Sequence, residues 1–156
     1  MLSHCLTTIK IIKEDIIAKL EKNDSECKSF FLKLAGDYYR YMSEMSTGEL
    51  LSKTRMSAHE HYKQADIAAR GLQPCNSVKL GIALNFSVFQ YEVMKEPKKA
   101  VSLAESALEE AHHKIDDVDE ETYREAKSVL ELIKDNLLKW KREEEGNEAF
   151  DEDDLV

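Results

Sequence analysis

The sequence predicts an all-α protein in which about six helices form an antiparallel array. Helix-breaking residues are rare, since the 156 residues include five glycines and two prolines. Apolar residues recur at helical spacing through most of the chain, and the connections between these segments are short. Short connections favour antiparallel neighbours, and a chain of this length fits one domain with its own core.

The first two predicted helices are marked by apolar spacing and by the breakers between them. The first covers about residues 2–20, and its apolar residues are Leu2, Leu6, Ile9, Ile16 and Leu20. Asn23-Asp24-Ser25 ends it, because these residue types favour turns. The second helix runs from about residue 26 to residue 45, and Ser46-Thr47-Gly48 is its stop signal.

The third and fourth predicted helices follow. The third runs from residue 49 to about residue 70, before Gly71, a favoured C-terminal cap residue, and Pro74. The fourth covers about residues 77–95 and has two apolar stripes: Leu80, Ala83, Leu84 and Val88, and then Ile82, Phe86, Phe89 and Val93. A helix that is apolar almost all round is either buried or packs on the core with one side and on a ligand with the other.

The last two predicted helices have recognisable starts. The fifth opens at Glu96-Pro97, where proline suits the first helical position. The sixth opens at Asp119, with carboxylates in its first turn that complement the positive end of the helix dipole, and runs to about residue 142. Residues 143–156 are acidic with few apolar side chains, which predicts a disordered tail after a helical domain of residues 1–142.

Composition excludes several classes of protein. The net charge of −9 would repel nucleic acid, and no run of basic residues offsets it. No apolar stretch approaches the roughly 20 residues of a membrane span, and no secretory signal is visible. The three cysteines lack a CxxC pair and indicate free thiols in a reducing compartment. We therefore expect an acidic, cytoplasmic helical protein.

No sequence motif supports catalysis or a cofactor. The chain has no GxSxG, Walker A or GxGxxG pattern, and its carboxylates do not sit in the apolar settings that mark an acid–base pair. His59 and His61 are two residues apart, unlike the i, i+4 spacing of a metal-binding pair on a helix. We expect neither an enzyme nor a metal site.

A charged face on the second predicted helix is the strongest candidate for binding an anion. Lys33, Asp37, Arg40 and Glu44 fall at i, i+4, i+7 and i+11, which places them on one side of a helix, and Tyr41 lies beside them. The arginine fork fits a phosphate bidentately, and tyrosine adds a hydroxyl donor. Asp37 lies one turn from each basic residue and would hold both in place.

Two asparagines stand among apolar residues on other predicted helices. Asn85 lies on the fourth helix, and Asn136 lies on the sixth. A carboxamide both donates and accepts, so two of them on neighbouring helices would hold the backbone of an extended peptide. The plainer alternatives stay open: a helical asparagine is usually solvated, and a Lys-Asp-Arg face is usually an exposed ladder of ion pairs that adds little stability.

Three segments, in order and spacing, resemble the 14-3-3 family. The resemblance extends from about residue 16 to residue 140, and the family shares the acidic C-terminal tail. The segments are Phe31-Leu32-Lys33-Leu34-Ala35-Gly36-Asp37-Tyr38-Tyr39-Arg40-Tyr41, Leu80-Gly81-Ile82-Ala83-Leu84-Asn85-Phe86-Ser87-Val88-Phe89, and Asp135-Asn136-Leu137 with Trp140.

The resemblance implies an all-α adaptor that binds phosphoserine or phosphothreonine peptides in an amphipathic groove. Arg40 and Tyr41 match the family's phosphate ligands, and Lys33 matches a groove lysine nearby. Asn85 and Asn136 match the asparagines that hold the peptide backbone. The groove wall is matched by the apolar Val88, Val129 and Leu132 and by the polar and aromatic pair Glu92 and Trp140.

The chain departs from the family in length. Family members have about nine helices, and this sequence matches the part that begins with their fourth. The three helices before it supply much of the dimer interface and a further lysine and arginine of the phosphate pocket, so homo- or heterodimer formation stays open.

Two hypotheses follow from the sequence. The first is an adaptor that clamps phosphorylated segments of partner proteins. The second is a helical interaction protein that keeps the fold, has lost phosphate recognition and binds partners through apolar helix faces.

Overall fold

The computed structural model describes residues 1–20 and 24–153, with side chains up to residue 146. The chain is all-α, with six α-helices and no strand in these residues, so the predicted fold class is confirmed. The helices are α1 (Leu2–Lys10), α2 (Ser25–Glu44), α3 (Gly48–Ala68), α4 (Ser77–Glu92), α5 (Pro97–His112) and α6 (Glu120–Asp153). Three short turns of other helical types are η1 (Ile11–Ile16), η2 (Ile17–Lys19) and η3 (Ile115–Asp117).

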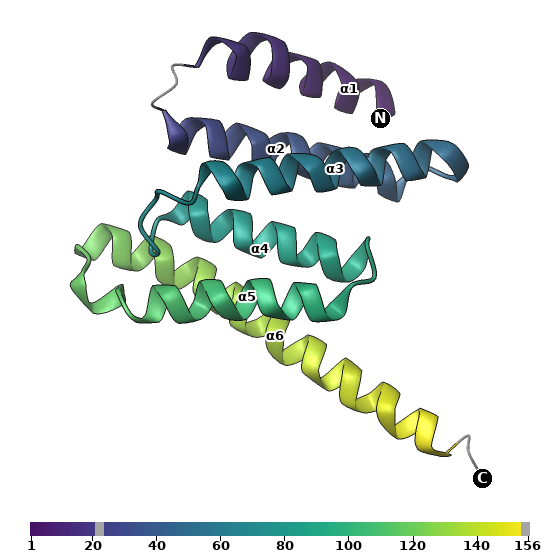
Figure 1. The fold of residues 1–156 in the computed structure, drawn as a ribbon, viewed down its shortest axis with the longest axis vertical. Coiled ribbons are helices and arrows are strands. Elements are labelled where there is room, and N and C mark those ends of the chain that lie inside the picture. The colour runs from purple at the N-terminus through teal and green to yellow at the C-terminus, as the bar shows by residue number, and fades with distance from the viewer. Residues whose placement is uncertain (21–23, 154–156) are drawn as a thin grey trace.

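The helices pack side by side, and α4 occupies the centre (Figure 1). It contacts α2 and α3 on one side and α5 and α6 on the other. The chain of α1, η1 and η2 packs against α2, whereas the C-terminal part of α6 projects past the end of α5 (Figure 1). A residue on α4 can therefore link the N-terminal and C-terminal halves of the array.

Side-chain caps fix the starts of α2 and α4. Asp24 Oδ1 accepts a hydrogen bond from Cys27 N at 3.1 Å. Asn76 Oδ1 accepts from Val78 N at 2.9 Å and from Lys79 N at 3.1 Å. Each cap satisfies backbone N–H groups that have no partner inside the helix, which explains why α2 and α4 begin directly after these residues.

The first predicted helix is interrupted. Residues 2–20 form α1, then a π-helical segment (η1) and a 3₁₀ turn (η2), rather than one α-helix. Ile9 and Ile12 are buried on this path, and Ile16 is half-buried. A π turn takes more residues than an α turn, so it rotates the later isoleucines relative to the α-helical stripe. Residue 23 of the predicted breaker lies outside the described residues.

The last helix is longer than the sequence predicts. We expect it to end near Arg142, whereas α6 runs to Asp153. Residues 143–149 contain four glutamates and one alanine, which favour helix, with one glycine, one asparagine and no proline. The division into a domain of residues 1–142 and a disordered tail of residues 143–156 stays a prediction, and residues 154–156 lie outside the described residues.

Two apolar clusters surround α4. One joins α3 and α4 through Ala58, Tyr62, Phe86, Phe89 and Val93. The other joins α5 and α6 through Ala100, Ala104, Ile133, Leu137 and Trp140, with Leu84 and Val88 of α4 packed against it. Within the described part of the chain, no helix combines the length and the apolar content that a membrane crossing requires.

Gly36 is predicted to be required by the packing of α3 on α2. A Cβ at this position would lie 3.0 Å from both Cδ1 and Cε1 of Tyr62, a fully buried ring that stacks on Phe86 with centroids 5.5 Å apart. We expect Gly36→Ala to lower the free energy of unfolding by about 1–3 kcal/mol through overpacking. Urea denaturation followed by circular dichroism measures it.

Gly81 provides the matched control for Gly36. It also lies inside a helix, but an added Cβ would meet no atom within 4 Å. Gly81→Ala is expected to raise the free energy of unfolding by up to about 1 kcal/mol, because alanine favours helix. Equal stability of the two variants would contradict the close contact at Gly36.

His61 is predicted to make the fold less stable as the pH falls. The side chain is 8 % exposed, its Nδ1 lies 2.7 Å from the Ser57 carbonyl, and its ring lies 5.0 Å from the ring of Tyr39. Burial lowers the pKa of His61, and the nearby Lys13 lowers it further, while the Ser57 carbonyl and Glu60 act in the opposite direction.

The sign of the pH effect follows from that lowered pKa. The unfolded histidine, with a pKa near 6.5, takes up a proton at a higher pH than the folded one. The stability that the neutral ring provides is complete above pH 6.5 and is lost as the pH falls towards the folded pKa. Between pH 8 and pH 5.5, wild type should lose more unfolding free energy than His61→Gln, and parallel pH profiles would contradict this.

Candidate functional site

The candidate site is built around the buried carboxylate of Asp37 on α2. Lys33 Nζ lies 3.1 Å from Asp37 Oδ2, and an Arg40 terminal nitrogen lies 3.7 Å from Asp37 Oδ1. The three side chains are 15 %, 14 % and 6 % exposed for Lys33, Arg40 and Asp37. The i, i+4 and i, i+3 spacings on one helix place both cations over the same carboxylate, as the sequence predicts.

Two further residues reach Asp37 from other helices. Tyr62 on α3 donates its hydroxyl to Asp37 Oδ1 at 2.5 Å, and Asn85 Nδ2 on α4 lies 3.0 Å from Oδ1 and 3.1 Å from Oδ2. A carboxylate with four ion-pair or hydrogen-bond partners is held in position more firmly than one in an exposed ladder of ion pairs. The plainer interpretation of this face as a solvated ladder therefore does not describe these residues.

The surroundings of Tyr62 keep its hydroxyl protonated. Burial raises the pKa of Tyr62 well above its usual value, and the negative charge of Asp37 raises it further. The phenol therefore remains a hydrogen-bond donor to Asp37 at any physiological pH. Sequence reasoning missed this residue because nothing in the local pattern of α3 distinguishes a buried tyrosine of the core from one that holds a carboxylate.

Several neighbouring side chains surround the guanidinium group of Arg40. Its guanidinium carbon lies 5.1 Å from the centroid of the Tyr41 ring, and its buried Nε has no hydrogen-bond partner among the described residues. Burial lowers the pKa of Arg40, but the neighbouring Tyr62, Asp37 and Tyr41 outweigh it, so the pKa is raised overall. The guanidinium is thus permanently charged and partly open to solvent.

The local charge favours an anion. Lys33 and Arg40 carry two positive charges against the one negative charge of Asp37, although the whole chain has a net charge of −9. Tyr41, next to Arg40, is 43 % exposed and carries a hydroxyl donor. A phosphate group carries about −1.5 to −2 charges and accepts charge-assisted hydrogen bonds from such donors.

The two predicted backbone-binding asparagines have different surroundings. The Asn85 amide nitrogen is engaged by Asp37, which leaves its oxygen to accept a hydrogen bond from a peptide N–H. Asn136 on α6 is half-buried, and no hydrogen bond joins it to Asn85 or Arg40. The structure therefore brings Arg40 and Asn85 together through Asp37, while the meeting of Asn136 with them in one groove stays a prediction.

The predicted wall residues differ in exposure. Val88 and Val129 are half-buried and pack against the same α5–α6 cluster, whereas Leu132 is 53 % exposed. Glu92 is exposed near the end of α4. All three keep some apolar surface exposed, and their place in one groove wall beside the site stays a prediction.

Trp140 lies in the core. Its side chain is 2 % exposed and stacks on Tyr91, with ring centroids 4.7 Å apart. Tyr91 in turn donates its hydroxyl to Glu143 Oε2 at 2.6 Å, and burial together with this hydrogen bond raises the pKa of Tyr91 to about 12. Trp140 offers little surface of its own to a ligand, and its place in the groove wall with Glu92 stays a prediction.

The described residues hold no group of three or more histidine, cysteine, aspartate or glutamate side chains placed to bind a metal ion. The three cysteines are free thiols, with Cys5 and Cys75 buried and Cys27 exposed.

Comparison with known proteins identifies the family. A family model described as 14-3-3 protein matches residues 1–141. The 14-3-3 protein beta/alpha of Xenopus tropicalis is 39 % identical over 150 residues, which are 92 % of this chain and 62 % of the relative. A 14-3-3 protein homolog of Encephalitozoon cuniculi is 42 % identical over 153 residues, 97 % of this chain and 59 % of the relative.

A third relative matches the chain at a similar identity and coverage. The 14-3-3 protein beta/alpha of Mus musculus is 38 % identical over 146 residues, 93 % of this chain and 58 % of the relative. The chain thus spans about three fifths of the length of these relatives. The match along nearly the whole sequence, together with the all-α array, shows that the chain belongs to the 14-3-3 family.

Proposed function

We propose that this chain is an adaptor that binds phosphoserine- or phosphothreonine-containing segments of partner proteins in the cytoplasm. The phosphate would lie against Arg40, Tyr41 and Lys33. The observation that carries the proposal is the fixed position of the two cations: Asp37 holds Lys33 and Arg40, and is itself held by two residues from other helices. Cations fixed in advance lose little freedom when the phosphate binds.

The peptide backbone would run from the phosphate towards α6. The free oxygen of Asn85 would accept one backbone N–H, and Asn136 would hold the next part of the segment. Val88, Val129 and Leu132 would contact its apolar side chains. Binding would mask the phosphorylated site of the partner or hold one conformation of it, and no bond would be made or broken.

A peptide titration tests this proposal. The purified chain is titrated into a fluorescein-labelled degenerate peptide pool with a central phosphoserine, and into the same pool with serine, at two salt concentrations. We expect the phosphorylated pool to bind more tightly and to lose affinity as the salt concentration rises, because salt screens the partly exposed charges. Equal binding of the two pools would count against the proposal.

A second candidate function is favoured by the apolar surface of α6. Leu132 and Leu138 are 53 % and 55 % exposed, which would suit an apolar partner helix better than water. In that case the chain would bind partners without phosphate recognition. Its binding would be insensitive to phosphorylation and would not weaken with salt.

A further inference from the structure

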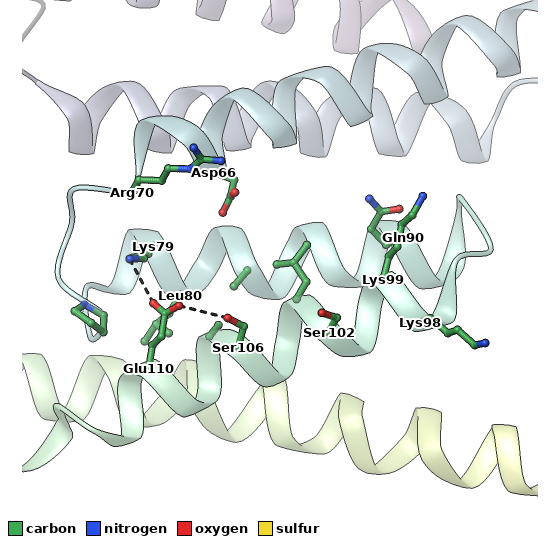
Figure 2. A pocket seen from close by; sticks show the side chains of 14 residues that line it. Asp66, Arg70, Lys79, Leu80, Gln90, Lys98, Lys99, Ser102, Ser106 and Glu110 are labelled. Carbon is green, nitrogen blue, oxygen red and sulfur yellow. Dashed lines mark hydrogen bonds and ion pairs between the residues drawn. The ribbon is translucent and has the colours of Figure 1, made fainter.

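A cavity lies on the far side of α4 from Asp37. It has a volume of about 820 Å³ and is formed between α3, α4 and α5 (Figure 2). Residues of an α-helix follow one another at about 100°, so Leu80, Ala83 and Gln90, which line the cavity, project to the opposite side of α4 from Asn85. The thickness of α4 therefore separates this cavity from the candidate phosphate site.

The floor of the cavity is apolar. Leu80 and Ala83 of α4 and Leu103 and Ala107 of α5 line it. The two alanines are short, so the floor lies deep between the helix axes. A volume of this size is within the range of about 300–1,000 Å³ that is usual for sites of small organic ligands.

The rim of the cavity is positively charged. Four basic residues, Arg70, Lys79, Lys98 and Lys99, line it with two acidic ones, Asp66 and Glu110. This excess of cations stands out in a chain with a net charge of −9. A small organic anion would therefore be attracted to this part of the surface and repelled by most of the rest.

Lys79 and Glu110, at one end of the cavity, are paired with each other. Lys79 Nζ lies 3.7 Å from Glu110 Oε2 and donates to the Leu72 carbonyl at 3.3 Å. Ser106 Oγ donates to Glu110 Oε1 at 3.3 Å, as the dashed lines in Figure 2 mark. Lys79 is therefore less available to an anion than an unpaired lysine, and Arg70, which also lines this end, is exposed.

The opposite end is lined by the amide side chain of Gln90. Gln90 is 4 % exposed, its side chain lines the cavity, and the amide makes no hydrogen bond with the described residues. Among the described residues, the fully buried side-chain polar atoms without a hydrogen bond belong to Arg40 and Arg55, so the Gln90 amide is in contact with the water of the cavity. A ligand group can take the place of that water.

The turn between α4 and α5 brings two lysines to the same end. Glu96 N donates to the Gln90 carbonyl at 2.9 Å, and Figure 2 shows Gln90 with Lys98 and Lys99 away from Lys79 and Glu110. Lys99 Nζ lies 3.2 Å from Glu96 Oε1, whereas Lys98 makes no ion pair with any residue that the structure describes. In Figure 2 the Lys98 side chain points away from Gln90, and as an exposed side chain it is free to turn towards a head group at this end.

We propose that this cavity binds a small amphipathic organic anion. The apolar body of the ligand lies along Leu80, Ala83, Leu103 and Ala107. Its carboxylate or phosphate head group accepts a hydrogen bond from the Gln90 amide and faces Lys98. The axial distance between Lys79 and Gln90, eleven residues apart on α4, is about 16 Å, which suits an elongated ligand.

Octanoate, octyl phosphate and uncharged octanol are the probes that test this proposal. Titration calorimetry of the full chain should give saturable binding of the two anions and much weaker binding of octanol. Tighter binding of octyl phosphate than of octanoate would assign the head group to the phosphate class, and the reverse order would assign it to the carboxylates. Octanol binding as tight as that of both anions, or no saturable binding at all, would overturn the proposal.

Variants locate the head group. Lys98→Glu is expected to weaken octanoate binding about tenfold, and Gln90→Leu about five- to tenfold, through loss of one charge-assisted contact or one hydrogen bond. Lys98 is exposed, so its variant should fold normally even if Gln90→Leu does not. Lys114→Glu makes the same charge change at an exposed lysine that does not line the cavity, and equal losses in the two lysine variants would overturn the assignment.

The same titrations separate this site from the phosphopeptide proposal. Arg40→Ala should leave octanoate affinity unchanged, because Arg40 does not line the cavity. A loss of octanoate binding in Arg40→Ala would place the anion at the Asp37 site and overturn the proposal.

Discussion

Replacing Asp37 by alanine is expected to lower the free energy of unfolding by about 3–5 kcal/mol, because it leaves two largely buried cations without their counter-charge. Lys33 and Arg40 are 15 % and 14 % exposed and both face this carboxylate. The hydroxyl of Tyr62 and the amide of Asn85 would lose their acceptor at the same time. Urea denaturation followed by circular dichroism measures the loss.

Two further variants separate the causes of that loss. Asp37→Asn keeps one oxygen for Tyr62 but removes the charge and turns an NH₂ group towards Lys33 or Asn85, so it should also be strongly destabilised. Asp15 pairs with Lys19 at 3.6 Å, but both side chains are more than 60 % exposed. Asp15→Ala should therefore cost less than about 1 kcal/mol. Similar losses in Asp37→Ala and Asp15→Ala would show that the Asp37 network adds little to stability.

The sequence predicted the parts of this network that are local along one helix. Lys33, Asp37 and Arg40 are three or four residues apart, and helical geometry alone places such residues together. The helix starts were predictable for a similar reason, since Asp24 and Asn76 cap the helices that follow them. In each case the interaction spans a few residues of a regular element.

The interactions that cross between helices were not predictable in this way. Tyr62 and Asn85 are 25 and 48 residues from Asp37, and their contact depends on how three helices pack. The contact between Gly36 and Tyr62 has the same origin. Residue type and the family resemblance assign Asn85 to a peptide backbone, whereas its amide nitrogen also holds Asp37.

The departures from the predicted helix bounds have a related cause. The π-helical segment Ile11–Ile16 keeps Ile12 buried, which depends on the packing of this segment against α2. An apolar residue every third or fourth position is compatible with more than one kind of helix. The predicted helix was therefore right in position, and its internal geometry was decided by tertiary contacts.

Arg40→Ala is expected to lower the affinity for a phosphoserine peptide by at least about 100-fold. Two charge-assisted hydrogen bonds from a guanidinium to a phosphate contribute about 1.5–3 kcal/mol each, and about 1.4 kcal/mol corresponds to a tenfold change in affinity. Lys33→Ala removes a single ammonium and should cost about tenfold. Arg40→Lys should lie between them, because lysine keeps the charge without the bidentate fork. Fluorescence anisotropy with the phosphorylated peptide pool measures all three.

The order of the three losses in affinity distinguishes phosphate binding by Arg40 from a general loss of stability, because a general loss of stability would not produce that order. Arg40 and Lys33 both contact Asp37, so removing either one disturbs the same network by a comparable amount. Thermal unfolding of each variant shows how far that disturbance goes. If Arg40→Ala bound phosphopeptide as well as Lys33→Ala at similar stability, the phosphate would not sit on the guanidinium. The fixed position of Arg40 over Asp37 and beside Tyr41 would then serve the fold rather than the ligand.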